Sequence, residues 1–214
     1  MVQYRDRVSL RFYLYISDAK VDMLLPQVDP GFGGKRESEV GISLKIFSAK
    51  HKVETPQSQR VTRLERVVRY LDDFADVGTI DEPGQYFRGR MTMRWGQLHD
   101  ATHGVYFGGH TDRTVVGLGG SIGHVIGSSA AAPDAFSPSL TPGVVRSLGS
   151  LIENDTTDPL AAVHLAERHL TGPEQEVEFV AKRLAHGPSP YPELDRGRTM
   201  NVLLGSPIFV AMAD

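Results

Sequence analysis

The segment from residue 104 to residue 127 constrains the fold of this chain more than any other, because it holds eight of the 22 glycines. It reads GVYFGGHTDRTVVGLGGSIGHVIG, so that short apolar runs alternate with glycines. Glycine allows positive φ angles and close approach of the backbone to other groups. Such glycines beside apolar runs are typical of strands that contain tight turns or bulges, or that another group approaches closely. We therefore expect a hairpin here, with a functional site among its polar residues.

Apolar alternation and β-branched or aromatic runs predict the strands, and apolar stripes at helical spacing predict the helices. The expected strands are 8–16, 40–47, 86–95, 105–107, 114–118 and 202–212, the last bent at Gly205–Pro207. The expected helices are 19–25 (ended by Pro26), 57–75, 142–152 and one from Asp158 that ends before Gly172. Residues 173–186 have acidic residues early and basic residues late, as a helix often does, but the apolar pattern of 177–184 also fits a strand. Residues 29–39 and the Pro/Ala/Ser-rich segment 128–142 are expected loops.

The order of these elements predicts the fold class. Strands and helices do not alternate regularly, which disfavours a parallel α/β sheet. We expect an α+β fold, a mainly antiparallel sheet with helices packed on it, in a single domain over residues 1–214. A sheet that ends in an apolar strand is also compatible with a homo-oligomer.

Composition excludes several classes of function. The chain has no cysteine, which excludes disulfides, thiolate nucleophiles and cysteine-bound metals. Its net charge is -3, whereas nucleic-acid-binding proteins usually carry a basic surface, so we expect no nucleic-acid partner. No apolar run approaches the roughly 20 residues of a membrane span, and the start lacks a signal peptide, so we expect a cytoplasmic protein.

The first candidate site is His110 with Asp112 and Arg113 at the tip of the expected hairpin. An imidazole beside a carboxylate is suited to general base catalysis, and the arginine to binding an anionic substrate. Alternatively, this segment is a polar turn in which Asp112 bonds its own backbone.

The glycines that follow suggest a second site. Residues 117–127 hold Ser121 and His124 and resemble a dinucleotide fingerprint, but the glycine spacing and the βαβ context do not match. We expect no cofactor, and treat Ser121 and His124 as substrate-binding candidates. His99, His103 and His110 have ligand types suited to zinc but no matching motif, so we assign no metal. Without a G-x-S-x-G element, the chain is not expected to be a serine hydrolase.

Two further groups are candidates. Glu178, Lys182 and His186 follow at steps of four, which places them on one face of a helix or of a strand. They form either an acid–base row or a solvated, salt-bridged face. Asp18 and Lys20 follow the first strand with Ser17, where capping accounts for Ser17 and Asp18 and leaves Lys20 as a cation for substrate binding.

Four segments carry a resemblance to a known family: YLYISDAKVDMLLPQ (13–27), VYFGG…RTVVGLGGS (105–121), VEFVAKRLAHGPSP (177–190) and VLLGSPIFVA (202–211). With these segments the chain resembles a family of actinobacterial proteins, common in Streptomyces, that has no established activity. The resemblance implies a cytoplasmic actinobacterial setting, in specialised metabolism or in signalling and conflict systems. It assigns no catalytic residue.

Two functions are compatible with these observations. The first is a cofactor-independent enzyme of specialised metabolism that condenses, cyclises (as in a Pictet–Spengler reaction) or isomerises a small polar substrate by acid–base chemistry. His110 and Asp112 would then be catalytic, with Glu178 and His186 as further candidates. The second is a non-catalytic module that binds a small molecule or a partner protein.

Overall fold

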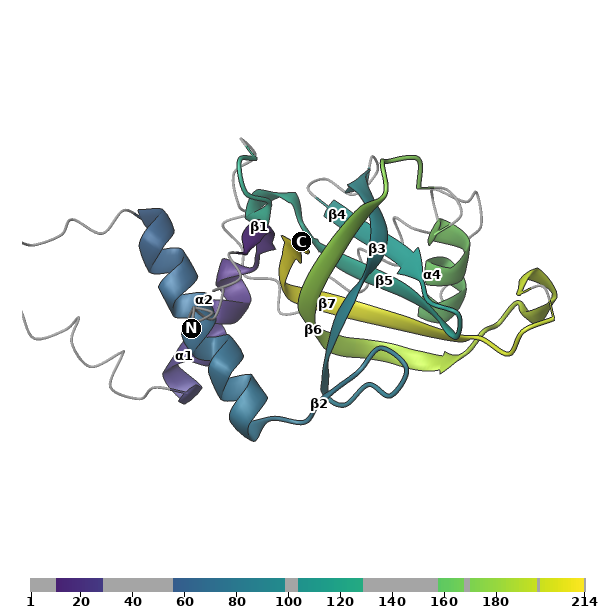
Figure 1. Ribbon diagram of the computed structural model, residues 1–214, viewed down its shortest axis with the longest axis horizontal. Coiled ribbons are helices and arrows are strands. Elements are labelled where there is room, and N and C mark those ends of the chain that lie inside the picture. The colour runs from purple at the N-terminus through teal and green to yellow at the C-terminus, as the bar shows by residue number, and fades with distance from the viewer. Residues whose placement is uncertain are drawn as a thin grey trace, which may run out of the picture.

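The fold is described from a computed structural model, in which residues 11–28, 56–98, 104–128, 158–167, 170–195 and 197–213 are described (Figure 1). Five strands form a closed ring of hydrogen-bonded neighbours in the order β3, β4, β5, β7, β6 and back to β3. They are β3 (Tyr86–Leu98), β4 (Gly104–His110), β5 (Thr114–Ser121), β6 (Gln175–Pro188) and β7 (Asn201–Met212). The expected α+β fold is present, but its sheet is a barrel rather than an open sheet.

Two long strands close the barrel by changing partners along their length. The first half of β3 pairs with β6, and its second half pairs with β4. One edge of β7 pairs with β6. The opposite edge of β7 pairs first with β5 and then with the short strand β1 (Phe12–Ile16). The β5–β7 pairing is parallel, as is the pairing of the two-residue strand β2 (Val77–Gly78) with β3. Two register shifts between β6 and β7 help these strands to bend around the ring.

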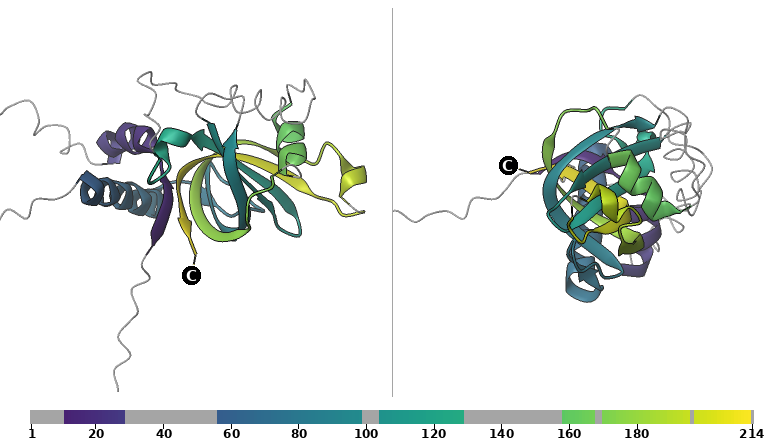
Figure 2. Two further views of the ribbon diagram at one scale, coloured as in Figure 1. Left: turned by 90° about the horizontal axis from the view of Figure 1, so that it is seen from above. Right: turned by 90° about the vertical axis from the view of Figure 1, so that its right-hand side faces the viewer.

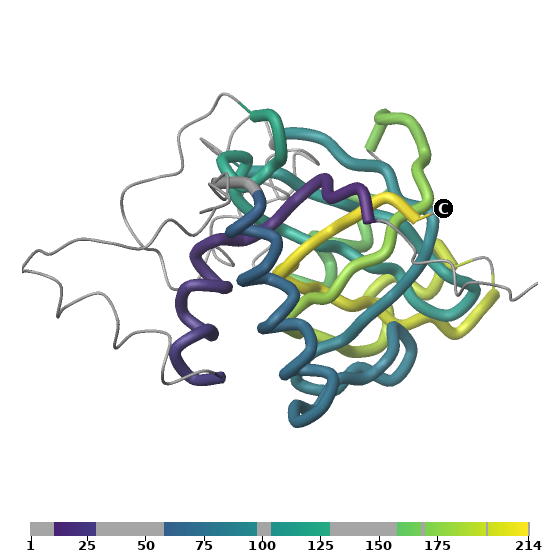
Figure 3. The backbone as a smooth tube through the Cα atoms, turned by 60° about the vertical axis from the view of Figure 1, so that its left-hand side comes forward, coloured from purple at the N-terminus to yellow at the C-terminus, as the bar shows by residue number. Residues whose placement is uncertain are grey.

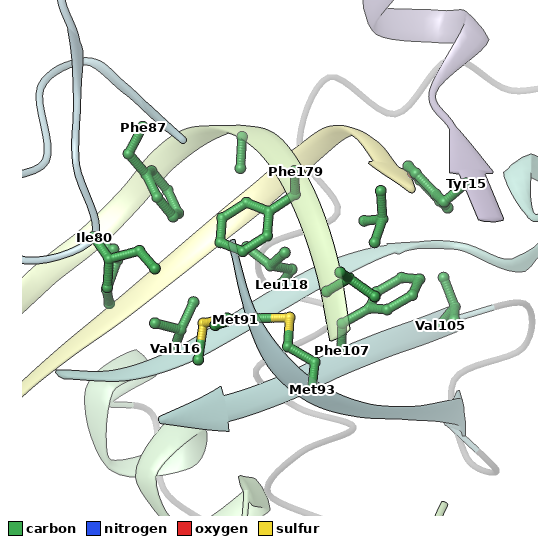
Figure 4. Packing of buried hydrophobic residues seen from close by; sticks show 14 residues of the cluster. Tyr15, Ile80, Phe87, Met91, Met93, Val105, Phe107, Val116, Leu118 and Phe179 are labelled. Carbon is green, nitrogen blue, oxygen red and sulfur yellow. The ribbon is translucent and has the colours of Figure 1, made fainter. Parts of the chain in front are cut away.

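The inside of the barrel is a hydrophobic core. Alternate residues of β6, Val177, Phe179 and Ala181, point inward. They pack with side chains from the other strands, including Tyr15, Phe87, Met91, Met93, Val105, Phe107, Val116, Leu118, Leu203 and Val210 (Figure 4). Because bulky side chains fill the interior, the barrel itself is a core rather than a ligand chamber.

The three α-helices of the described residues cover the outside of the barrel at opposite ends (Figure 2). Helices α1 (Asp18–Val28) and α2 (Pro56–Phe74) lie side by side and bury Leu25, Leu64 and Val67 against Phe209 and its neighbours (Figure 3). Helix α4 (Pro159–Glu167) packs small residues against the outer faces of β4, β5 and β7. Short 3-10 helices among the described residues are η1 (Ile122–His124) and η2 (Pro192–Leu194).

The structure corrects two predictions from the sequence, the end of the first helix and the type of the element at 173–186. Pro26 lies inside α1 rather than ending the helix; it lacks the hydrogen bond to the carbonyl four residues earlier, and the helix ends two residues later at Val28. Residues 175–188 form a strand, so the helical interpretation of 173–186 is wrong and the strand alternative is confirmed. Val180 faces α2 while Val177 and Phe179 face the barrel, so β6 is apolar on both faces and its pattern imitates helical spacing.

Other expectations lie outside the described residues. They are the loop 29–39, the strand 40–47, the segment 128–142 after Ser128, and the helix 142–152. The hairpin of β4 and β5 is confirmed, with Gly104 opposite Ser121 and His110 opposite Val115.

Packing inside the barrel predicts the effect of substituting Gly205. A Cβ at this position would lie 2.5 Å from the Phe87 ring and 3.0 Å from Leu118. We expect Gly205→Ala to lower the free energy of unfolding by about 1–3 kcal/mol, since the buried ring has little room to shift. The control is Gly96→Ala, whose Cβ would meet no atom within 4 Å. Urea unfolding of both variants tests this, and equal stabilities would contradict it.

Candidate functional site

The polar residues that the fold brings together lie where β1 passes into α1. The amide of Ser17 donates to the carbonyl of Ile208 at 2.8 Å, and the amide of Ile126 donates to the carbonyl of Leu14 at 2.9 Å. These bonds hold the end of β1 between β7 and the segment that follows β5. We call the residues gathered here the β1–α1 junction cluster: Tyr15, Ser17, Asp18, Lys20, Arg60, Ser121 and His124.

Arg60 of α2 fixes the geometry of this cluster. Its Nε donates to Asp18 Oδ1 at 2.7 Å, and its Nη2 donates to the carbonyls of Ile16 at 2.8 Å and His124 at 3.3 Å. The other oxygen of Asp18 lies 3.6 Å from His124 Nδ1, an ion-pair distance too long for a hydrogen bond. Burial acts to raise the pKa of Asp18, but His124 and Arg60 outweigh it and hold that pKa below its usual value. One arginine therefore ties α2, β1, α1 and η1 together.

Lys20 contributes a buried amine to the cluster. Its Nζ donates to Ser17 Oγ at 3.3 Å, and burial lowers the pKa of Lys20 to about 8. Within the described parts of the chain, no carboxylate forms an ion pair with it. A lysine desolvated in this way keeps a sizeable neutral fraction near pH 8, which makes it a base or a nucleophile.

Three buried polar atoms of the cluster lack a hydrogen-bonding partner among the described residues: Tyr15 Oη, Ser121 Oγ and His124 Nδ1. Burial raises the pKa of Tyr15 to about 12, against opposing effects of Ser17 and of the Ser121 backbone, so the phenol stays protonated. A Cβ on Gly120 would lie 2.5 Å from Tyr15 Oη, so this glycine makes room for the phenol. Because buried polar groups are almost always satisfied, either a buried water or a bound ligand is expected to complete these hydrogen bonds.

The structure separates His110 from its expected partner. His110 Nδ1 lies 3.1 Å from Glu167 Oε1 of α4, while the exposed Asp112 contacts Arg198 at 3.3 Å. Asp112 therefore does not orient His110, and Glu167 takes that place. Arg113 is exposed in the turn, where its carbonyl accepts a bond from Asn201. The hairpin tip is a polar turn, as the sequence also allowed, but the side chain that bonds its backbone is Thr111 rather than Asp112, since Thr111 Oγ1 accepts from the amides of Arg113 and Thr114.

The row of Glu178, Lys182 and His186 is broken in the structure. The register of β6 shifts between Arg183 and Ala185, and the extra residue reverses which face later side chains occupy. Glu178 pairs with Arg11, and the Lys182 ammonium lies 5.3 Å from the centre of the Tyr86 ring. His186 is exposed, and partial burial together with Arg183 lowers its pKa. These residues do not form one acid–base site.

Two hollows on the barrel surface are occupied by paired charges. The first has a volume of about 250 Å³ and is lined by Arg11, Arg88, Arg90 and Glu178 among others. The second, of about 290 Å³, contains His110, Glu167, Arg94 and Glu174. Carboxylates pair with the arginines of these walls (Arg11–Glu178, Arg88–Asp72, Arg90–Glu176 and Arg94–Glu174), and His110 contacts Glu167. The β1–α1 junction cluster, which is not one of these hollows, combines unsatisfied polar atoms with the buried amine of Lys20, and we therefore take it as the candidate site.

A buried His–Asp pair lies near the opposite end of the barrel. His164 Nε2 of α4 is 2.8 Å from Asp195 Oδ1, and the two side chains are 4% and 2% exposed. The His164 ring also lies 5.7 Å from the Tyr191 ring, centre to centre. The pair joins α4 to the β6–β7 connection, and its remaining polar atoms, His164 Nδ1 and Asp195 Oδ2, also lack partners among the described residues.

The metal expectation can be tested only in part. His99 and His103 lie outside the described residues, and within the described ranges no group of three or more histidines and carboxylates could hold an ion. The glycine pattern at 117–127 belongs to the end of β5 and to η1, where Gly117 and Gly120 make room for the Tyr106 and Tyr15 rings.

Four of the seven cluster residues were candidates from the sequence: Asp18, Lys20, Ser121 and His124. Ser17 was expected only as a cap, and Tyr15 only as part of the strand 8–16. Arg60, in the expected helix 57–75, was not a candidate, although its contacts make it central to the cluster. The spacing of Ser17 and Lys20, three residues apart at a helix start, is the signal that could have linked them.

The lowered pKa of Lys20 makes stability depend on pH. In the unfolded chain this amine titrates near 10.5, so between about pH 8 and pH 10.5 the unfolded state binds more protons and stability rises with pH. We expect the stability of the wild type relative to Lys20→Met to increase by roughly 1–3 kcal/mol across this window. Urea unfolding at several pH values measures it. The tyrosines common to both proteins cancel in this comparison, and a stability difference that stays constant across the window would contradict the prediction.

The contacts of Arg60 predict its contribution to stability. Replacing Arg60 by Met leaves Asp18 and the Ile16 carbonyl without this donor, at a cost of about 1–3 kcal/mol. Arg69→Met, at an exposed position of the same helix, is the matched control and should cost less than about 0.5 kcal/mol. Thermal and urea unfolding report the difference, and similar losses in both variants would refute the role given to Arg60.

Comparison with known proteins identifies the family. None of the helices in the described ranges has both the length and the apolar character that a membrane crossing needs. No curated protein and no solved structure matches the chain. One family model matches residues 11–214, and it is described as a family of unknown function, DUF7019. The matched range includes every residue of the β1–α1 junction cluster. Because it covers nearly the whole chain, this protein belongs to the DUF7019 family.

Proposed function

We propose that this protein is a cofactor-independent enzyme that performs acid–base chemistry on a small polar molecule at the β1–α1 junction cluster. The observation that carries the proposal is the amine of Lys20, which burial desolvates and which donates to the Ser17 hydroxyl, at a junction where further buried polar atoms lack partners. Lys20 takes the role first assigned to His110, because Lys20 is desolvated and forms no ion pair among the described residues, whereas His110 is exposed and paired with Glu167.

The amine of Lys20 has the properties of a general base. With a pKa of about 8, roughly one-tenth of it is neutral at pH 7, and that fraction can accept a proton from a bound substrate. The resulting ammonium can return the proton to the product. Condensation, cyclisation and isomerisation all require such a transfer, and none of them requires a redox cofactor.

The neighbouring groups are suited to holding the substrate. Tyr15 has a phenol that stays protonated and can donate a hydrogen bond. Ser121 has a buried hydroxyl that can donate or accept, and the positive end of the α1 dipole favours a negatively charged or polarised substrate group. Arg60 and Asp18 hold the frame, so the site is preorganised before the substrate binds.

A non-catalytic binding module is the alternative, and one observation favours it. Ser17 is 1% exposed and Tyr15 is 0% exposed, which suits a ligand held in an enclosed site. The resemblance to actinobacterial proteins supports a cytoplasmic setting in specialised metabolism, or in signalling and conflict systems for the alternative. Both settings are part of this proposal.

Turnover of a mixed metabolite pool tests the proposal without a known substrate. Wild type, Lys20→Met and the control Lys182→Met are each incubated with a small-molecule extract, and compounds are followed by mass spectrometry. We expect at least one compound to be consumed by wild type and Lys182→Met, and at least about a hundredfold more slowly by Lys20→Met. The rate should rise with pH as Lys20 loses its proton near pH 8.

The opposite outcomes are distinct. Equal consumption by wild type and Lys20→Met would remove Lys20 from the chemistry. If no compound is consumed, but one stays bound to the wild type in native mass spectrometry, the binding module is correct and the enzyme proposal fails.

A further inference from the structure

The hydroxyl of Ser17 has a role that capping does not explain. The Ser17 carbonyl accepts the amide of Val21 at 3.0 Å, so Ser17 stands at the N-cap of α1. Its Oγ, however, accepts a bond from Lys20 Nζ at 3.3 Å instead of from an amide of the first turn. Ser17 and Lys20 are three residues apart, so one helical turn brings the hydroxyl and the amine together. The Ser17 hydroxyl is therefore in hydrogen-bonding contact with an amine that can accept its proton when the amine is neutral.

The surroundings of Ser17 add what a serine nucleophile needs. The first amides of an α-helix have no partners within the helix, and they create a positive potential beside the N-cap. An oxyanion that develops next to Ser17 would be stabilised by such donors. The same Ser-x-x-Lys spacing at a helix start supplies the nucleophile and a lysine partner in serine β-lactamases and penicillin-binding proteins, which is an analogy of arrangement only.

A second, independent observation points to a ligand at this place. The hydroxyl of Ser121, a residue 3% exposed, is buried and has no hydrogen-bonding partner in the described ranges. The fully buried Tyr15 hydroxyl lies next to the Ser17 side chain and the Ser121 backbone, whose hydrogen-bonding groups act to lower its pKa, but it forms no well-aligned hydrogen bond there. These groups could bind the carbonyl or leaving group of a molecule that reaches Ser17.

We infer that Ser17 is an acyl-accepting nucleophile with Lys20 as its base, and that the substrate is a small carboxylic acid derivative, such as an ester, thioester or amide. This inference rests on the proposed function, since it gives Lys20 a defined proton to remove. The absence of a G-x-S-x-G element argues only against the hydrolases built on that turn, because a lysine one turn away can take the place of their histidine.

The reaction follows two balanced steps. Ser17 Oγ attacks the carbonyl carbon while its proton passes to the neutral Lys20 Nζ, and the tetrahedral intermediate then expels the leaving group, which takes that proton. The product is an ester on Ser17. Water, or another nucleophile, then gives a proton to Lys20 and attacks the ester, and the returning proton restores the Ser17 hydroxyl.

Acetylation by p-nitrophenyl acetate tests the inference, and the probe is small because Ser17 is almost completely buried. We expect a burst of p-nitrophenol and one acetyl group, mapped to Ser17 by peptide mass spectrometry and removed by neutral hydroxylamine, as an ester is. Ser17→Ala should abolish the burst. Lys20→Arg, which keeps the charge but cannot act as a base near neutral pH, should slow it at least a hundredfold.

Matched controls separate reactivity from folding. Ser189→Ala and Lys182→Met should both react like the wild type, and circular dichroism of every variant must show the native spectrum. A stable acetyl amide on Lys20 instead of an ester on Ser17 would overturn the nucleophile while leaving Lys20 as a reactive base. Absence of any burst, or an unchanged burst in Ser17→Ala, would also overturn it. Ser17→Ala is also tested with the compound found in the metabolite pool. If this variant still consumes that compound and Lys20→Met does not, the nucleophile Ser17 is refuted and the acid–base function of Lys20 stands.

Discussion

The pairing of β7 with three other strands is the constraint on which the rest of this structure depends. One side of β7 follows β6 along nearly its whole length, and the other side pairs with β5 and then with β1. Because the first half of β3 also pairs with β6, these contacts turn a sheet into a ring. The ring shields the phenylalanines and methionines of the core from water on all sides, and it leaves few free strand edges.

The same pairing places the candidate site. β1 joins the end of β7 that β5 has left, so the chain emerges from β1 beside the end of β5. Helix α1 therefore begins next to Ser121 and His124, which are about a hundred residues away in the sequence. Arg60 then fixes this junction through bonds to a carboxylate and to two carbonyls. The outer edge of the barrel, rather than its filled interior, is where polar groups remain available for chemistry.

How far the site could be predicted differs from residue to residue. Lys20 and Asp18 were found because a strand followed by a helix start is a local pattern. His110 was overvalued for the same reason, since its neighbour Asp112 is close in sequence but faces Arg198. Its real partner, Glu167, lies on a helix 57 residues away, and no local pattern connects the two. Burial of Lys20, which lowers its pKa, likewise depends on elements distant in the chain.

The sequence by itself determined the strands of the β4–β5 hairpin, the long helix α2 and the polar character of the β1–α1 junction, because periodicity, capping and turn residues act over a few neighbours. Only the tertiary structure decided that the sheet closes, that residues 175–188 are a strand, and that Ser17, Lys20, Tyr15 and Ser121 meet. The strand β6 illustrates the physical reason. Its two faces are both buried, one by the barrel core and one by α2, so its own pattern does not distinguish helix from strand until those partners are in place.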